Sequence, residues 1–514
     1  MSRWRIDRPA IAILSVAVVV GTWLRFEQLD RLDFTPGEAV SWVAASAPNL
    51  RAVFASALVL NPGKLGVHDL ALHLWMGAFG DGLSTMRELS AGLGALSILL
   101  TFAVVRELMA PPLEEDTTRI DDGRDWIAAT AALLVALNLP LIFYSRAARM
   151  YMVLVPAILA QVWFFIRAHR IGGRLNYCGT AAFSALALAT HFTAGSVMVG
   201  EVLWLAPELL HGLSRPLADT LRRRATRLVI ALTAGGLTLS PVLYHALGIG
   251  FDFFASNGFR WVPKPGLYAP ITFLVMGLGE ATNGPVAGRH ALDDSFIVIT
   301  TLAAWGAISF RREERSAVTF ALLWFLTPVV LPQVLSYIVT PFLLLEYALS
   351  SFVAVAILAA IGIHRIGGLG KYAALALVLV FLCGPIQRFR RRTAEPWSKA
   401  SEFVSANLGP HEVAMVDPGW TVDVVHYYLR SKPNSIEAAP NRVLQLRPPL
   451  PNLLMITDYA ARHDPVGIEL LSMRPQLLER FSGISIYRIA PDTIAQPAEI
   501  GAPPALDKTG GAAR

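Results

Sequence analysis

Residues 9–26 read PAIAILSVAVVVGTWLRF, an apolar run that decides the fold class of this chain. A helix needs about 20 apolar residues to cross the hydrocarbon core of a bilayer, with a range near 17–25. A cleaved signal peptide would carry a small-residue cleavage site after its apolar stretch, but Arg25 and Phe26 stand there instead. The run is therefore predicted to be a retained first transmembrane helix.

Similar runs recur along the chain. Hydrophobic residues make up 54% of the sequence and charged residues 16%, whereas soluble domains carry roughly 25% charged residues. The length criterion predicts about eleven spans. They are residues 9–26, 85–108, 126–145, 148–168, 176–192, 194–210, 228–246, 294–310, 317–338, 346–364 and 370–386. Residues 70–79 and 271–279 are too short to cross and are predicted to be interfacial or re-entrant helices. We therefore expect an all-α polytopic membrane protein.

Arginines in the short loops predict the orientation. Five basic stretches, at the N-terminus and near residues 167–174, 215–227, 311–315 and 365–371, fall on one side, which is predicted to be cytoplasmic. Residues 27–84, 251–293 and everything after about 388 then face outward. Two features oppose this orientation: the acidic loop 110–125 would be cytoplasmic, and an arginine cluster at 388–392 would lie outside. The formal charge of +6 follows the loops, so no nucleic-acid partner is expected.

The sequence changes character after residue 390. Residues 413–416, 453–456 and 484–489 are predicted to be strands, and residues 397–408 a helix. We expect three parts: a polytopic domain at 1–390, a small extracytoplasmic α/β domain at 391–490 and a disordered tail at 491–514. Cys178 and Cys383 lie inside apolar runs, so neither a disulfide nor a cysteine-ligated metal is expected.

Two motifs in the first outward loop could carry chemistry. Glu38 follows Pro36-Gly37 at the start of a predicted helix, where a carboxylate could act as a general base or a metal ligand. It could equally be a carboxylate in the first turn that interacts with the helix dipole. His68 and Asp69 open the short apolar helix and are expected to face water. This pair could bind a phosphate or a metal, or could be an N-cap.

Residues 143–151 read FYSRAARMY and join two predicted spans on the outward side. Arg146 and Arg149 are three residues apart, which predicts one helical face, and Tyr151 follows them. Guanidinium groups at an interface suit bidentate contacts to phosphate. The alternative is that both arginines reach the lipid headgroups, as arginines and tyrosines at span ends commonly do.

Three further positions are candidates. His191 lies near the outward end of its span, and Glu201 lies inside the next one. An ionisable residue at membrane depth is expected to be functional or to bond between helices. Arg260 and Lys264 flank Trp261 in a later outward loop, a composition that fits a lid over an anionic substrate.

The order of these motifs over residues 9–390 resembles the C-type superfamily of glycosyltransferases, which use sugars carried on polyprenyl phosphate. Within it the chain is most similar to bacterial protein-mannosyltransferase-like enzymes and to the galacturonosyltransferases that modify lipopolysaccharide. Thr190-His191-Phe192 and Glu346-Tyr347 complete the order. Three positions depart from the family pattern: Gly37 replaces an acid, Asp69-Leu70 replaces a proline pair, and Glu346 replaces an arginine.

The resemblance implies a multi-pass enzyme of the bacterial inner membrane, with its active site on the extracytoplasmic face. It would transfer one sugar from a polyprenyl-phosphate donor to a lipid, glycan or protein acceptor, with inversion at the anomeric carbon. Glu38 would be the base, supported by Asp69. The substrate-binding residues would be His68, Arg146, Arg149, Tyr151, His191, Arg260 and Lys264. No cofactor is certain; cations or a divalent metal would stabilise the leaving phosphate.

Two other classes remain open. A transporter or flippase of lipid-linked sugars predicts internal repeats and ion sites at the bilayer midplane, but this chain shows no repeat, and its polar motifs gather toward one membrane face. A non-catalytic membrane scaffold predicts no such gathering of carboxylates and cations.

Overall fold

The computed structural model describes residues 6–61, 64–110, 123–210, 216–237, 262–278, 294–341, 343–430, 435–440 and 451–489, with isolated residues 240, 244 and 248. The predicted tail 491–514, the acidic loop apart from its two ends, and Arg260 lie outside the described residues. The chain divides into two compact units. The first comprises residues 1–31 and 40–393, and the second comprises residues 32–39 and 394–514.

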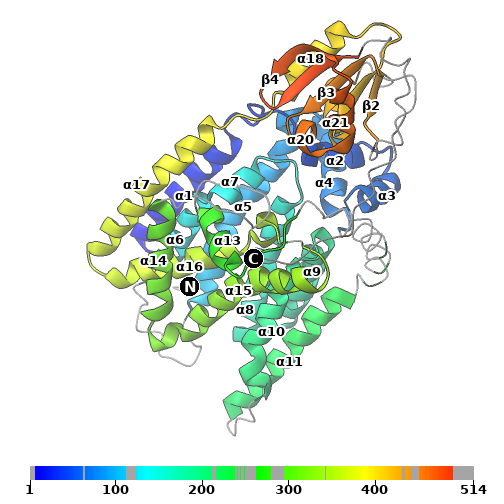
Figure 1. The fold of residues 1–514 in the computed structure, drawn as a ribbon. Coiled ribbons are helices and arrows are strands. Elements are labelled where there is room, and N and C mark those ends of the chain that lie inside the picture. The colour runs from blue at the N-terminus through cyan, green and yellow to red at the C-terminus, as the bar shows by residue number, and fades with distance from the viewer. Residues whose placement is uncertain are drawn as a thin grey trace, which may run out of the picture. The chain divides into compact units, whose positions relative to one another are not determined.

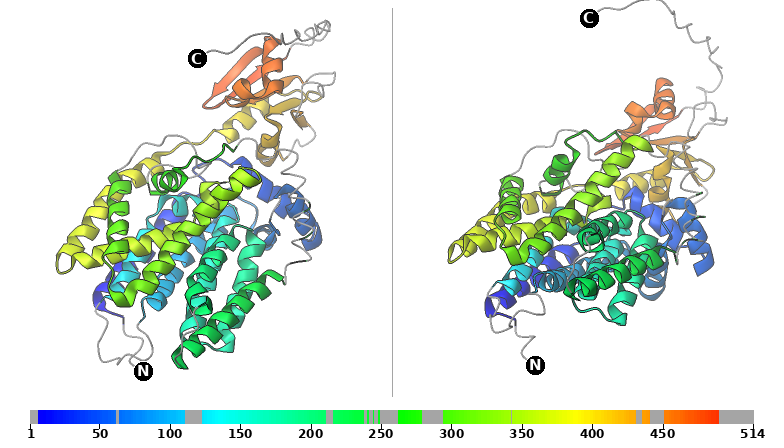
Figure 2. Two further views of the ribbon diagram at one scale, coloured as in Figure 1. Left: turned by 60° about the horizontal axis from the view of Figure 1, so that its bottom comes forward. Right: turned by 90° about the horizontal axis from the view of Figure 1, so that it is seen from below.

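The first unit is a bundle of helices (Figures 1 and 2). In chain order its helices are α1 Arg8–Phe26, α3 Leu50–Leu60, α4 Val67–Phe79, α5 Leu83–Leu108, α6 Arg124–Ala136, α7 Leu139–Ser145, α8 Tyr151–Ile171, α9 Arg174–Thr190, α10 Ala194–Leu210, α11 Pro216–Leu237, α13 Ala269–Leu278, α14 Asp294–Ile308, η2 Arg312–Glu314, α15 Arg315–Ile338, η3 Leu345–Ala348, α16 Ser351–Ile366 and α17 Gly370–Arg391. Helix α2, Pro36–Ala45, begins in the second unit and ends in the first.

Five of the described helices are long and apolar enough to cross a membrane: α1, α5, α8, α15 (with η2) and α17. A sixth span results if the bent pair α6 and α7 is counted as one. The polytopic character expected from the sequence is therefore confirmed. The number of eleven spans stays a prediction, because the other apolar helices are shorter or less apolar.

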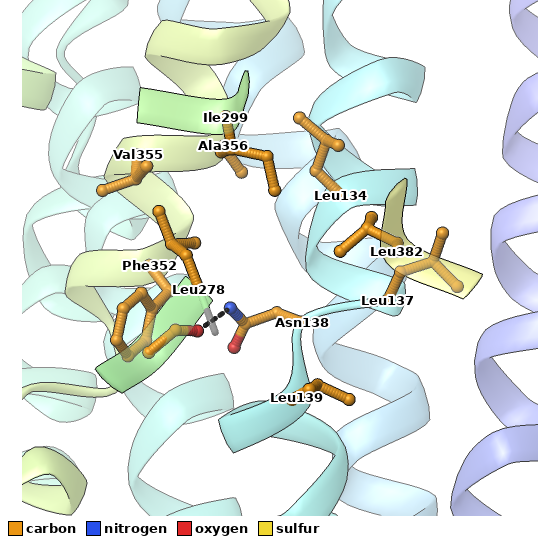
Figure 3. Close-up of a pocket in the computed structure, with 11 residues that line it drawn as sticks. Leu134, Leu137, Asn138, Leu139, Leu278, Ile299, Phe352, Val355, Ala356 and Leu382 are labelled. Atoms are coloured by element: carbon orange, nitrogen blue, oxygen red, sulfur yellow. Dashed lines mark hydrogen bonds between the residues drawn. The ribbon is translucent and has the colours of Figure 1, made fainter. Parts of the chain in front are cut away.

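The predicted span 126–145 is broken, since α6 and α7 meet at a bend of 61°. The break occurs where Pro140 occupies the first turn of α7 and the Asn138 side chain caps it by accepting from the Leu141 N–H at 3.2 Å. Asn138 also donates to the Gly277 carbonyl at 3.0 Å, beside a cavity of about 20 Å³ that is otherwise largely apolar (Figure 3). Such a cavity holds about one water molecule.

Arg25 contacts the end of α6 at this break. Its guanidinium is buried and donates to the Gly21 and Ala136 carbonyls, both at 2.9 Å. The Ala136 carbonyl is at the end of α6, where no further turn of helix can bond it. A buried cation thus bonds a main-chain oxygen that the bend exposes.

Helices α6 and α16 are buried along most of their length. Small residues let α16 approach α14 closely: a Cβ added to Gly306 would lie 2.0 Å from the Leu358 carbonyl oxygen, and one added to Gly362 would lie 2.0 Å from that of Leu302. Membrane helices commonly pack through small residues, because lipid provides no hydrophobic force between them.

The second unit contains a five-stranded sheet in the order β2-β1-β3-β5-β4. Its elements are α18 Trp397–Asn407, β1 Ala414–Asp417, η4 Gly419–Thr421, α19 Val422–Tyr428, β2 Ile436–Ala438, β3 Leu453–Thr457, α20 Ala460–His463, α21 Pro465–Ser472, β4 Gln476–Phe481 and β5 Ile484–Arg488. Strands β1, β2 and β3 are parallel, whereas β5 pairs antiparallel with both β3 and β4. Every residue of β1 and β3 is buried, as expected for parallel strands covered on both faces.

Candidate functional site

The turn between α7 and α8 directs its two arginines to different places. Residues 146–150 form a turn and bends, so the prediction that Arg146 and Arg149 share a helical face is wrong. Arg146 donates to the Leu24 carbonyl at 2.9 Å and to the Gln28 carbonyl at 3.0 Å. Arg149 donates to the Ser41 hydroxyl at 3.2 Å instead. A helix would have placed both guanidinium groups on one ligand, and the turn separates them.

Arg149 belongs to a polar cluster, the Arg149 cluster, at one end of the bundle. Its members come from the loop before α4, from α4, from the end of α7, from the turn between α7 and α8, from the start of α8 and from η3. They are Lys64, Asp69, Tyr144, Arg149, Tyr151 and Glu346. The Arg149 guanidinium donates to the Tyr151 hydroxyl, and the Tyr144 hydroxyl donates to the Glu346 carboxylate. The two tyrosine rings lie edge to face, with centroids 4.5 Å apart.

Lys64 is the residue of this cluster that sequence reasoning missed. Burial lowers the pKa of the Lys64 ammonium well below its usual value, and the nearby Arg149 lowers it further, while Asp69 and Glu346 raise it. The cluster therefore places two cations beside two carboxylates. The available signal was weak: Lys64 is the single cation between α3 and α4, directly after Pro62-Gly63.

His68 and Asp69 are buried, with 2% and 4% of their surfaces exposed, which corrects the expectation that they face water. Gly66, in a left-handed conformation, is the N-cap of α4, so neither side chain has that role. The His68 Nδ1 lies 3.7 Å from the Asp69 Oδ1. Neither His68 nitrogen nor the Asp69 Oδ1 has a hydrogen-bond partner among the described residues. Buried polar atoms of this kind usually have a hydrogen-bond partner, so these three atoms are candidates to bond a polar ligand.

Glu38 lies in the first turn of α2 and belongs to the second unit. Its Oε2 accepts from the Thr35 hydroxyl at 2.9 Å and from the Thr35 N–H at 3.1 Å. This pattern is that of a carboxylate which closes a helix N-terminus. A hydrogen-bonded carboxylate in a fixed orientation can also accept a proton from a substrate hydroxyl.

Of the remaining candidates, His191 borders the Arg149 cluster, with its ring centroid 6.4 Å from that of Tyr151. His191 Nδ1 lies 2.8 Å from the Thr193 hydroxyl, and its ring packs on Tyr347 with centroids 4.6 Å apart. Glu201 accepts from the Gln161 amide at 2.9 Å, which is the bond between helices that its position allowed. Lys264 is exposed. Within the described part of the chain, no three His, Cys, Asp or Glu side chains are placed to hold a metal ion.

No family model and no curated protein matches the sequence. Among solved structures, the chain is similar to ArnT from Cupriavidus metallidurans bound to undecaprenyl phosphate, with a TM-score of 0.55, 13% identity and coverage of 93% of this chain and 97% of ArnT. The apo state of ArnT has the same TM-score and identity, with coverage of 94% of this chain and 98% of ArnT. A third similar structure is the archaeal oligosaccharyltransferase AglB from Archaeoglobus fulgidus, in complex with an inhibitory peptide and a dolichol-phosphate. Its TM-score is 0.49 and its sequence identity 10%, with coverage of 92% of this chain and 74% of AglB.

The likeness to ArnT spans nearly the whole of both chains. It shows that this protein shares the fold of ArnT, so the resemblance indicated by the order of its motifs holds at the level of the fold. At 13% identity the comparison concerns the fold, so the chemistry must be argued from the residues of this chain.

Proposed function

We propose that this protein is a glycosyltransferase that moves one sugar from a polyprenyl-phosphate donor to an extracytoplasmic acceptor, with inversion at the anomeric carbon. The observation that carries the proposal is the Arg149 cluster, in which a half-buried lysine and an arginine lie near one another at one end of the helical bundle. A sugar-phosphate donor requires cations at the site of reaction, because the lipid phosphate leaves as an anion. ArnT, whose fold this chain shares, has been crystallised with undecaprenyl phosphate.

Lys64 and Arg149 are assigned to the donor phosphate. Arginine suits two parallel bonds to phosphate oxygens, and lysine adds a compact charge. The family pattern expects an arginine where this chain has Glu346, and Lys64 compensates for that loss, since it lies in the electrostatic reach of Glu346. His68 is assigned a contact to the donor through its unpaired ring nitrogens.

The proposed reaction needs one proton acceptor. The acceptor hydroxyl oxygen forms a bond to the anomeric carbon while the bond from that carbon to the phosphate oxygen breaks, and the electron pair leaves with the polyprenyl phosphate. The hydroxyl proton passes to a carboxylate, for which we assign Glu38, with Asp69 in support. The proposal includes eleven spans, a bacterial inner membrane and an active site on the extracytoplasmic face, where the second unit would meet the acceptor.

The test measures transfer of radiolabelled sugar from a panel of polyprenyl-phosphate donors in membranes. Glu38→Gln should lower transfer at least about 100-fold and leave donor binding intact, because the base acts only in the chemical step. Lys64→Gln should weaken binding of polyprenyl phosphate as well as transfer. Lys399→Gln, at an exposed lysine of α18, is the matched control and should behave as wild type.

The outcomes separate the assignments. Wild-type transfer that survives Glu38→Gln refutes Glu38 as the base and makes Asp69 the next candidate. Unchanged polyprenyl-phosphate binding by Lys64→Gln refutes the phosphate site. Wild-type membranes that transfer no sugar from any donor refute the enzyme, and movement of the labelled lipid across the bilayer in the same membranes would then identify a transporter.

A further inference from the structure

A second cationic site lies in the first unit, in a pocket of about 420 Å³. Three segments contribute to it: the end of α1 with the residues after it, the turn after α7, and the end of α17. Its charged lining residues are Glu27, Arg31, Arg146, Arg390 and Arg391. Two glutamines, Gln28 and Gln387, and the apolar side chains of Leu24 and Phe389 complete the lining.

The positive charge of this pocket is only partly neutralised. Arg390 pairs with Glu27, its Nε lying 3.0 Å from the Glu27 Oε2, and that is the single carboxylate of the lining. Arg146 is fixed by the two carbonyls that it bonds, and its pKa is lowered to about 10, first by burial and then by the charge of Arg31. Repulsion between arginines costs stability unless an anion offsets it.

Arg31 and Arg391 are available for a ligand. Both are exposed. Arg31 reaches the Phe389 carbonyl only at 3.5 Å, and Arg391 makes no hydrogen bond or ion pair with the residues that the structure describes. The exposed guanidinium groups of Arg31, which makes only this long bond, and of Arg391 lie beside the fixed Arg146, and together they match the several oxygens of a phosphate group.

The pocket lies where two candidate membrane spans end. Helices α1 and α17 are two of the five helices that are long and apolar enough to span a bilayer, and the pocket is at their C-terminal ends. Trp23, beneath Arg390 at 4.8 Å, is 48% exposed, and Phe26 is 41% exposed. Exposed aromatic side chains at the end of a span are typical of the level of the lipid headgroups.

We propose that this pocket binds the phosphate headgroup of an anionic membrane lipid, at a site separate from the one assigned to the sugar donor. Arg146 and Arg149 leave the same turn in different directions, so the two sites are served by different side chains. The apolar flank favours a lipid over a free phosphate. Such a ligand also gives a reason for the arginine cluster at 388–392 on the side that the positive-inside rule would leave poor in arginine.

The test is a titration of the purified full-length protein in detergent, followed by native mass spectrometry. The probes are dioleoyl phosphatidic acid, dioleoyl phosphatidylcholine and inorganic phosphate. The double variant Arg31→Gln and Arg391→Gln should bind phosphatidic acid at least about tenfold more weakly than wild type, because it loses both exposed guanidinium groups of the pocket. The double variant Arg312→Gln and Arg315→Gln makes the same charge change at exposed arginines beside η2 and should bind as wild type.

Phosphatidic acid that binds the Arg31 and Arg391 variant as tightly as wild type would overturn the proposal. Phosphatidylcholine that binds wild type as tightly as phosphatidic acid would overturn it too, since a zwitterionic headgroup offers less negative charge. Inorganic phosphate that binds as tightly as phosphatidic acid would refute the lipid as the occupant. None of these outcomes depends on sugar transfer, so the result stands apart from the enzyme proposal.

Discussion

Asp417 ends β1 and is fully buried, with neither carboxylate oxygen bonded to a described residue. Burial, with a smaller effect of Asp464, raises its pKa from 3.8 to about 7. The folded unit therefore binds this proton at pH values where the unfolded chain has released it. Stability contributed by the neutral carboxyl is present below about pH 4 and is lost as the pH rises to about 7.

The size of this loss follows from the two pKa values. One pH unit corresponds to about 1.4 kcal/mol, so a carboxyl with a pKa of 3.8 unfolded and about 7 folded costs the second unit up to about 4 kcal/mol above pH 7. Asp417→Asn keeps the shape of the neutral carboxyl and cannot ionise. The variant should therefore be more stable than wild type by a few kcal/mol at pH 8, but by only about 1 kcal/mol at pH 4.5.

Hydrogen exchange of the β1 and β3 amides in the full-length protein measures this difference, after correction for the intrinsic effect of pH on exchange. The wild type should lose protection in both strands between pH 4.5 and pH 8, and Asp417→Asn should keep it. Asp458→Asn, at the neighbouring and less buried carboxylate after β3, is the control and should follow wild type. Equal pH dependence of wild type and Asp417→Asn would refute the reasoning.

Three further substitutions test the helical unit. Gly362→Ile should destabilise the α14–α16 contact strongly, because even a Cβ there lies 2.0 Å from a main-chain oxygen of α14. Thermal unfolding in detergent should show a lower midpoint for this variant. Gly92→Ile, at a glycine with open space around it, is the control and should unfold as wild type does. Arg25→Met leaves the carbonyls at the end of α6 without their donor and should cost about 1–3 kcal/mol, seen as a lower midpoint of unfolding; an unchanged midpoint would contradict that role. Glu201→Leu should lower the free energy of unfolding by a similar amount, because the Gln161 amide loses its hydrogen-bond partner. Glu201→Gln should be close to neutral. Equal effects of the two substitutions would show that the hydrogen bond contributes little to stability.

Hydropathy and length determined the polytopic class, since the cost of exposing backbone groups to lipid leaves few alternatives to a long apolar helix. Strands β1 and β3 were predictable for a related reason, since each lies in a short apolar run, and β5 was predictable from the isoleucines at alternate positions of its sequence. Strand β4 was missed because it reads QLLERF and is mostly exposed, so it lacks the alternation that marks a half-buried strand.

The sequence also determined which residues were candidates for the site, because Arg149, His68 and Asp69 are polar groups beside apolar spans. Only the tertiary structure decided how they group. The turn after α7 sent Arg146 to the carbonyls of α1 and Arg149 to the Ser41 hydroxyl, and folding brought Lys64 within the field of Glu346 across 282 residues. Periodicity describes neighbours along one helix. A cluster of charges from four segments depends instead on how the bend of α6 and α7 and the loops before α4 and α16 pack. That packing is a property of the whole chain, and no local pattern encodes it.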